Sequence, residues 1–350
     1  MKKYIGMDVH KATTVIAVIN ESGRIITEAV VETSPAAILD FISSQRGCLH
    51  VTFEECAQAA WLYDMLRPHV ADLLVCDPRK IARASNKGDK SDARRLADLL
   101  RTNALTPVYH GEQTTTGLKE LAQGYTCLVE DRTRVKNRLK ALFRARGIAC
   151  EGSGVYSLDE RKQWLAKLDS PAVRARADRL CSELDCLEWL STEAELDLRA
   201  EARKHPAGKI LRSIPGIGFV RAAVIIGVAG TPHRFRTKRQ FWSYCGLAVR
   251  TVASSEYRML EGKVVRSSKR PLVRGLNRNY SRALKSVFKG AAKTVASGQW
   301  SSLFEAMVAN GTPESLAYLT LARKIASVTL ALWKRGERYS QKKMKIVHAA

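Results

Sequence analysis

The sequence predicts a mixed α/β domain at the N-terminus, then a helical segment, then a mainly α-helical C-terminal domain. Two observations indicate this order. Runs rich in β-branched residues fill the first 80 residues, such as TTVIAVI and LHVTFEE, and this composition favours strands. Helical spacing of apolar residues takes over from KSDARRLADLL onwards. The chain has 350 residues, 45% of them hydrophobic, which is enough for two or three domains with separate cores.

The first region, residues 1–114, alternates strands and helices. YIGMDV, TTVIAVIN and RIITEAVVET predict three consecutive strands, with ESG as a turn before the third. Pro35 is expected to open a helix. LHVTFEE then predicts a strand, AAWLYDMLRPH a helix, ADLLVCDP a fifth strand, and a further helix begins near Asp89. Three strands followed by alternating helix and strand is the order of the ribonuclease H-like fold, a mixed sheet flanked by helices.

The second region, residues 115–204, is expected to be a helical segment. One helix is predicted from about Thr115 to Arg146 with a basic second half, and GIACEGSGVYS separates it from further helix up to residue 204. Three leucines follow heptad-like spacing: Leu180, Leu184 and Leu187. This seam fits either a coiled coil between chains or a packed hairpin within one chain.

The third region, residues 205–350, contains a glycine turn between two helices. LRSIPGIGFVRAAVIIG predicts helix, tight turn and helix, and the glycines of PGIG would let backbone amides face outward to hold a phosphate. This is the pattern of a helix-hairpin-helix, which binds the DNA backbone regardless of sequence, although an ordinary turn between packed helices has the same pattern. The remainder is expected to be helical, apart from a loop-rich stretch from Gly246 to Lys269.

The charge balance points to a polyanionic partner. Lys and Arg number 58 against 34 Asp and Glu, for a net charge of +24, and such an excess most often serves nucleic acid. No apolar run reaches the roughly 18–20 residues that span a bilayer, and MKKYIGMDVHK is too short and too acidic for a signal peptide. Eight cysteines include no CxxC pair, so we expect reduced thiols in a cytoplasmic protein, without a zinc site or a membrane partner.

Carboxylates from three distant segments are expected to meet at one edge of the sheet. Asp8 ends the first strand, Glu54 and Glu55 end the fourth, and Asp89 and Asp92 stand one helical turn apart. Such a group would suffer mutual repulsion unless cations sat among its members. Hard oxygen ligands suit Mg²⁺, with Mn²⁺ as a substitute. A pair of these ions can activate a nucleophile and stabilise a leaving oxygen in phosphodiester chemistry.

Two alternatives stay open at this edge. Asp89 and Asp92 could simply be acids that favour the positive end of a helix dipole. The alternation of side chains along the strand does not show whether Glu54 or Glu55 points inward, because the strand ends there. His10, next to Lys11, is expected either to meet a phosphate or to lie in a surface turn.

A basic tract follows in the C-terminal region. From Arg258 to Lys293 there are eleven Lys or Arg and one acid, Glu261. Because this density repels itself, we expect it to contact nucleic-acid phosphates. One helix is expected to present five of these side chains on a continuous face: Arg274, Arg278, Arg282, Lys285 and Lys289. The full set predicted to bind nucleic acid is Arg258, Lys269, Arg270, Arg274, Arg278, Arg282, Lys285 and Lys289.

At these motifs the sequence resembles a known family. YIGMDVHKATTVIAVI, VTFEE and KGDKSDARRLADLL resemble the DEDD motifs of an insertion-sequence transposase family with a RuvC-like N-terminal domain. LRSIPGIGFVRAAVIIG, RFRTKRQFWSYCGLAVRT and SSKRPLVRGLNRNYSRALKSVFKGAA resemble its C-terminal transposase domain. The family includes pilin-gene inverting recombinases, and its members are now called bridge recombinases. The resemblance covers nearly the whole chain and implies a recombinase of a mobile element, with a metal-binding set of Asp8, Glu54, Asp89 and Asp92.

The resemblance also implies a serine nucleophile in the polar stretch after GLA. This chain reads CGLAVRTVASSEYR, and it departs from the family in having Val249 after GLA and SSEY where Ser-Gly is usual. Ser254 is the best match and Ser255 the second. Family members bind an element-encoded structured RNA that pairs with donor and target DNA, and they act as oligomers. The implied partners are therefore double-stranded DNA, a guide RNA and further copies of the chain, as a dimer or tetramer, in a nucleoid-associated protein.

Three other functions compete with this interpretation. A metal-dependent junction nuclease, with water as the nucleophile, would use the same carboxylates without a covalent intermediate. An actin-like ATPase or sugar kinase would share IGMDVHKATTVIAVINESGRI as a phosphate loop, but His10 and Lys11 stand where that loop needs glycines. A non-catalytic nucleic-acid binder leaves Asp8 unexplained.

Overall fold

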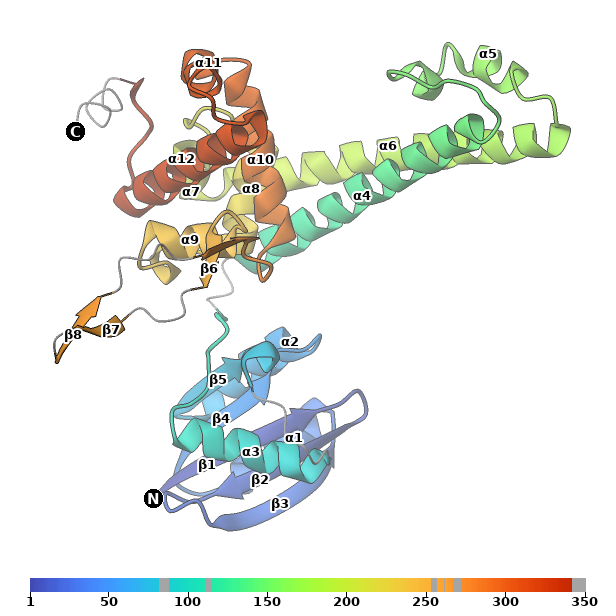
Figure 1. Cartoon of the computed structure of the whole chain (residues 1–350). Coiled ribbons are helices and arrows are strands. Elements are labelled where there is room, and N and C mark those ends of the chain that lie inside the picture. Colours follow the sequence, from blue (N-terminus) through green and yellow to red (C-terminus); the bar gives the residue numbers. More distant parts are fainter. Residues whose placement is uncertain (82–87, 111–114, 253–256, 261, 267–271, 342–350) are drawn as a thin grey trace. The chain divides into compact units, whose positions relative to one another are not determined.

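The N-terminal strands form one mixed sheet in the order β3-β2-β1-β4-β5. The computed structural model describes residues 1–81, 88–110, 115–252, 257–260, 262–266 and 272–341, and the chain divides into two compact units, Met1–Glu112 and Gln113–Ala350 (Figure 1). The central strand, β1, pairs antiparallel with β2 and parallel with β4. The strands are β1 (Lys2–Val9), β2 (Thr13–Ile19), β3 (Ile25–Glu32), β4 (Cys48–Glu54) and β5 (Asp72–Cys76). The mixed α/β class expected for this region is confirmed.

Helices cover both faces of this sheet. Ile5 and Met7 of β1 are buried against α1 (Pro35–Ser44) and α2 (Ala59–Leu66) on one face. Because side chains alternate along a strand, Gly6 and Asp8 point to the opposite face, where α3 (Asp89–Arg101) packs. Short 3₁₀ turns complete the unit at Arg67–His69 and Pro78–Lys80.

The approach of α3 to β1 requires a glycine. A Cβ atom on Gly6 would lie 2.1 Å from the carbonyl oxygen of Ala93 and 2.5 Å from the backbone nitrogen of Ala97. No other residue leaves this space, so the helix backbone rests directly on the strand. This contact fixes where α3 begins, close to the end of β1.

The second unit starts with a long helical hairpin. α4 (Thr116–Arg144) and α6 (Pro171–Arg203) lie side by side, with α5 (Arg161–Ala166) and the 3₁₀ turn Gly154–Tyr156 at the far end (Figure 1). A small core at that end includes Phe143, Val155 and Cys181. Leu184 of the heptad-like seam is buried in the described chain, so a packed hairpin is present whether or not a second chain also pairs with it.

The rest of the second unit is a helical core with short strands on it. Residues from both helices of the hairpin at its other end, including Leu118 and Leu198, share this core with the later helices. Its elements are α7 (Pro206–Leu211), α8 (Phe219–Ala229), the 3₁₀ turn Pro232–Arg234, α9 (Lys238–Tyr244), β6 (Val249–Val252), β7 (Tyr257–Leu260), β8 (Lys263–Arg266), β9 (Leu272–Leu276), α10 (Arg282–Ala296), α11 (Ser301–Ala309) and α12 (Glu314–Arg335).

Two expectations for this region were wrong. Within its described residues, the stretch from Gly246 to Lys269, expected to be loop-rich, contains three short strands. β6 pairs with β9, and β7 pairs with β8. The charged helix face expected to begin at Arg274 does not exist in that form, because Arg274 lies in β9 and α10 begins only at Arg282. Basic residues at helical spacing gave a false signal, because Gly275, with φ +69°, does not continue a helix from Arg274.

Helix α12 is long and apolar enough to cross a membrane by length and composition alone. Residues along it, including Leu321, Ile325 and Leu330, are buried in the core of the second unit. Its apolar composition is therefore explained by core packing.

Candidate metal centre and nucleic-acid interface

The pairing of β1 with β4 places Asp8 beside Glu54. The parallel register aligns Gly6 with Thr52 and Met7 with Phe53, and one further step along both strands brings Asp8 level with Glu54. Both side chains then point to the α3 face of the sheet. Strand β4 ends at Glu54, so the alternation of its side chains still includes Glu54, whereas Glu55 lies beyond the strand.

Glu55 has a different environment. Its backbone N–H donates to the carbonyl oxygen of Cys76 at 2.9 Å. Its Oε2 lies 2.6 Å from Nε2 of His110, and the His110 ring stacks on Tyr63 with centroids 5.1 Å apart. This carboxylate therefore binds the segment that follows β5, while Glu54 faces the other acids.

Helix α3 brings the remaining two acids to the same edge. Gly88 is its N-cap, no side chain caps it there, and Asp89 and Asp92 lie in its first turn. The backbone N–H of Asp92 donates to the carbonyl of Gly88 at 3.0 Å, which closes that first turn. The helix dipole stabilises both carboxylates, so a role as helix-start acids and a role at the sheet edge are compatible.

The electrostatics show that these acids act on one another. Burial raises the pKa of Asp8; His10 opposes this shift, and the carboxylates of Asp92 and Asp89 add to it. Burial also raises the pKa of Glu54, with further increases from Asp8 and Asp92 and an opposing effect of Arg95. All four predicted acids thus meet in one electrostatic cluster, and a bound cation would relieve its repulsion.

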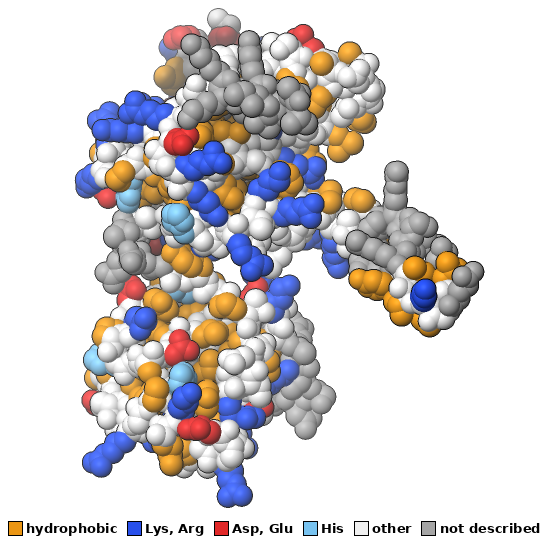
Figure 2. Space-filling model, turned by 90° about the vertical axis from the view of Figure 1, so that its left-hand side faces the viewer, with side chains coloured by type: hydrophobic (Ala, Val, Ile, Leu, Met, Phe, Trp, Pro, Cys, Tyr) orange, Lys and Arg blue, Asp and Glu red, His pale blue; other side chains and the backbone are white. Residues whose placement is uncertain are grey.

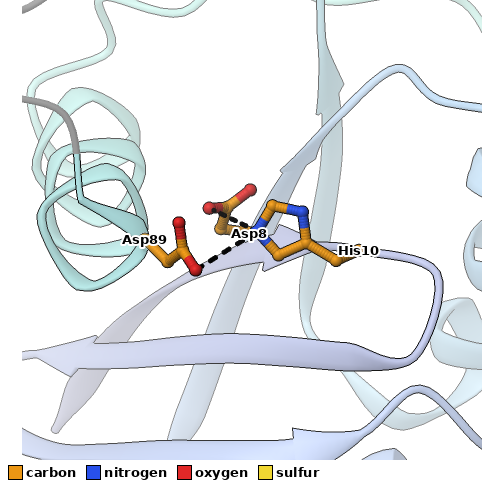
Figure 3. Close-up of side chains that lie close together, drawn as sticks. All are labelled: Asp8, His10 and Asp89. Atoms are coloured by element: carbon orange, nitrogen blue, oxygen red, sulfur yellow. Dashed lines mark ion pairs between the residues drawn. The ribbon is translucent and has the colours of Figure 1, made fainter.

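His10 lies between two of these acids. Its Nε2 is 3.2 Å from Oδ2 of Asp8 and 3.8 Å from Oδ2 of Asp89 (Figure 3). One ligand atom from each of the three residues lies within 4.8 Å of the others, so two carboxylate oxygens and an imidazole nitrogen could share one divalent ion. The sequence analysis missed this contact. The only available signal was the short turn after Asp8, where the His10 N–H donates to the carbonyl of Thr13.

A basic groove runs along α10. It has a volume of about 590 Å³ and is lined by Tyr280, Arg282, Lys285, Ser286, Lys289, Gly290 and Lys293. The Nζ atom of Lys285 lies 4.1 Å from the centroid of the Tyr280 ring. No acid lines this groove among the described residues, so its field favours a phosphate backbone. Lys and Arg side chains also gather over other parts of this unit (Figure 2).

Only some of the residues predicted to bind nucleic acid lie in this groove. Arg282, Lys285 and Lys289 share the α10 groove. Arg258 lies in β7, Arg274 in β9, and Arg278 is exposed between β9 and α10. Ser254, Ser255, Lys269 and Arg270 lie outside the described residues.

The PGIG turn is only partly as expected. Gly216 adopts a left-handed conformation with φ +76°, and a Cβ atom there would lie 2.8 Å from the carbonyl oxygen of Ala291 in α10. This glycine is required for packing against α10. Gly218 is exposed, so only this part of the turn has a surface open to a phosphate.

Two family models match this chain in the same order as its two units. Residues 5–145 match a model described as Transposase, for the DEDD transposase domain of IS110 elements. Residues 208–308 match the model described as Transposase IS116/IS110/IS902 family. The first match contains the carboxylate edge, and the second contains the PGIG turn and the basic groove.

Curated relatives agree with these matches. The chain is 25% identical to the transposase for insertion sequence element IS1111A of Coxiella burnetii over 344 residues, which cover 96% of this chain and 91% of that protein. It is 25% identical to a probable family 20 transposase of Pseudomonas aeruginosa over 254 residues, 70% of this chain and 74% of that protein. It is 26% identical to an IS110 insertion-element protein of Streptomyces coelicolor over 307 residues, 73% of each chain.

Proposed function

We propose that this chain is a DNA transposase of the IS110/IS116/IS902 insertion-sequence family. It cuts and rejoins DNA with Asp8, Glu54, Asp89 and Asp92 as a metal-binding DEDD set at the edge of a RuvC-like sheet. The observation that carries this proposal is the meeting of these four acids from three distant segments. Half-buried carboxylates such as Asp8 and Glu54, whose pKa values are raised by burial and by neighbouring acids, are typical of functional sites.

The donor set fits Mg²⁺, with Mn²⁺ as a substitute. Carboxylate oxygens are the ligands such ions prefer, and His10 adds a nitrogen that Mn²⁺ tolerates better than Mg²⁺. A bound ion would supply charge stabilisation at the phosphodiester. The protein's own contribution is to hold the acids on β1, β4 and α3. The pairing of β1 with β4 and the close contact of α3 at Gly6 set their mutual position.

We propose Ser254, with Ser255 as the alternative, as the nucleophile. The support is the sequence CGLAVRTVASSEYR and its resemblance to the family's C-terminal domain. The serine Oγ would form a bond to phosphorus while the bond to one deoxyribose oxygen breaks, and the proton lost by serine is matched by the one that this oxygen gains. The covalent link conserves bond energy, so rejoining needs no ATP.

The proposed partners are donor and target DNA, a structured guide RNA and further copies of the chain. The net charge of +24 supports the nucleic acids. Two large apolar side chains of α6, Trp189 and Leu196, are 62% and 55% exposed. They stand seven residues apart, which places them on one helix face, and this supports a contact between subunits through the hairpin.

The test starts with RNA that copurifies with the protein. This RNA is sequenced and returned to the protein with matching DNA, and recombinant joints are measured. Asp8→Ala is expected to abolish joints while DNA binding persists. A DNA substrate that traps intermediates should give a covalent adduct, and mass spectrometry should place it on Ser254. Joints at the wild-type level from Asp8→Ala would refute the metal-site proposal.

The nuclease alternative makes a different prediction in the same assay. With water as the nucleophile, a Ser254→Ala, Ser255→Ala double variant keeps full activity and no adduct forms on any serine. An adduct on Ser255 would keep the proposed chemistry and move its position by one residue.

A further inference from the structure

Three arginines converge on one aromatic ring at the start of α8. The Cζ atom of Arg212 lies 3.2 Å from the centroid of Phe219, and those of Arg199 and Arg203 lie 5.8 Å from it. Arg199 and Arg203 occupy the last turns of α6, while Arg212 follows α7. We call these three side chains around Phe219 the arginine cluster.

The cluster holds more positive charge than its neighbours balance. Arg199 pairs with Glu195. In the part of the chain that the structure describes, no carboxylate lies within ion-pair distance of Arg203 or Arg212, and Glu201, which is close in sequence, is 2.6 Å from Lys204 instead. A cation–π contact at an exposed site is weak and supplies no negative charge. Two exposed guanidinium groups therefore remain without a counter-charge.

Backbone donors of α8 add to the same surface. Phe219 is the first residue of this helix, Gly218 is its N-cap, and no side chain caps it among the described residues. Gly218 is exposed, and a Cβ atom there would meet nothing within 4 Å. The positive end of an 11-residue helix thus opens at the ring that the arginines surround.

The turn beneath the cluster is rigidly attached to α10. Arg221 donates to the carbonyl of Gly216 at 2.6 Å and to Oγ1 of Thr294 at 3.1 Å. It also lies against Gly290, which lines the basic groove. The arginine cluster and the groove are consequently held on one scaffold, in a fixed mutual geometry.

We propose that the arginine cluster is a second binding site for nucleic-acid backbone phosphates, separate from the α10 groove. Guanidinium groups bind phosphate oxygens in pairs of parallel hydrogen bonds, and the first-turn amides of α8 offer further donors. The site is open, as a continuous backbone requires. The inference rests on the proposed action on nucleic acid and assigns it a contact surface beyond the basic tract.

The test is equilibrium binding of the full chain with EDTA present, so that the carboxylate edge plays no part. The probes are a DNA duplex and an RNA stem-loop. Each lost phosphate contact makes the slope of log K against log salt shallower by about 0.9. The double variant Arg203→Ala, Arg212→Ala should therefore have a slope shallower by about 1.8. Between ~50 and ~200 mM salt its affinity should fall about 12-fold less than that of the wild type. Arg176→Ala, Arg179→Ala removes two exposed arginines elsewhere on α6 and is the matched control.

A lower slope with either probe, not seen in the control, supports the site and identifies whether DNA or RNA occupies it. Arg203→Ala alone keeps the contact between Arg212 and Phe219, so it tests the site without disturbing that packing, and its slope should fall by about 0.9. Unchanged slopes with both probes, or an equal fall in the control, overturn the proposal. None of these outcomes depends on the metal site, so failure here leaves the proposed carboxylate chemistry standing.

Discussion

The carboxylate edge of the first unit and the α10 groove of the second are built in opposite ways. Asp8, Glu54 and Asp92 are brought together from segments far apart in the chain, through strand register and one glycine contact. The groove takes Arg282, Lys285 and Lys289 largely from a single helix. The first arrangement depends on tertiary geometry, whereas the second needs only helical spacing.

This difference has a consequence for how each region tolerates change. A long-range acid cluster requires every supporting contact to be correct, since a shift of one strand by one residue would turn Asp8 or Glu54 to the other face. In a row of lysines and arginines each side chain makes its own phosphate contact, so the loss of one residue removes one contact. Changes at the carboxylate edge should therefore be nearly all-or-none, and changes in the groove graded.

The largest effect is expected from exchanging one of the two neighbouring glutamates. Glu54→Gln keeps the side-chain size and removes the charge, and it should lower metal-dependent strand joining by about 10³-fold. Glu55→Gln should stay within a few-fold of wild type, because that carboxylate faces His110. Joining rates at saturating Mg²⁺ measure both. The reverse result would show that the register of β4 does not determine the ligand.

Gly6→Ala tests the contact that positions α3. The added methyl group would lie 2.1 Å from the carbonyl oxygen of Ala93, so the helix must move, and overpacking of this kind costs about 1–3 kcal/mol or more. Activity should fall further than the lost stability explains, because Asp89 and Asp92 move with α3.

The control for this substitution is Gly124→Ala in α4. A Cβ atom at Gly124 meets nothing within 4 Å, so the same substitution in a helix interior should stabilise by about 0.5–1 kcal/mol. Denaturant unfolding measures both variants. Equal stability of Gly6→Ala and wild type would mean that the helix does not rest on the strand.

A graded effect is expected in the groove. Lys285→Ala, Lys289→Ala should lower the salt slope of DNA binding by about 1.8, at about 0.9 per phosphate contact. Lys119→Ala, Lys162→Ala removes two exposed lysines outside the groove and should change the slope less. Equal changes in the two pairs would show that net charge, and not the groove, sets the binding.

The smallest effect concerns stability and pH. Asp8 has its pKa raised in the folded protein, so the folded, metal-free protein binds protons more tightly than the unfolded chain. Its stability should therefore fall as the pH rises through the folded pKa of Asp8. Asp8→Asn should raise the melting temperature in EDTA at neutral pH, and the gain should vanish at acidic pH. A gain that is equally large at acidic pH would argue against the burial of a charged carboxylate as its cause.

Much of the first unit could be predicted from local sequence. The β-branched runs of β1 and β2, and Pro35 at the start of α1, are local signals that act within a few residues. The four acids proposed as the DEDD set likewise stand at the ends of predicted elements. The prediction of a helix through Arg274 was wrong. Lysines and arginines occur on solvated or phosphate-facing surfaces of strands and helices alike, so their spacing alone did not identify the strand at Arg274.

The sequence by itself determined the net charge of +24 and the set of acids. It also determined most of the strands and helices that carry these acids. Only the tertiary structure placed Glu54 near Asp8 and Glu55 against His110. It also placed His10 between Asp8 and Asp89 and gathered arginines around Phe219. The physical reason is range. Propensity and periodicity are properties of neighbouring residues, whereas strand register, the approach of α3 at Gly6 and the packing of α8 on α10 depend on residues distant in sequence.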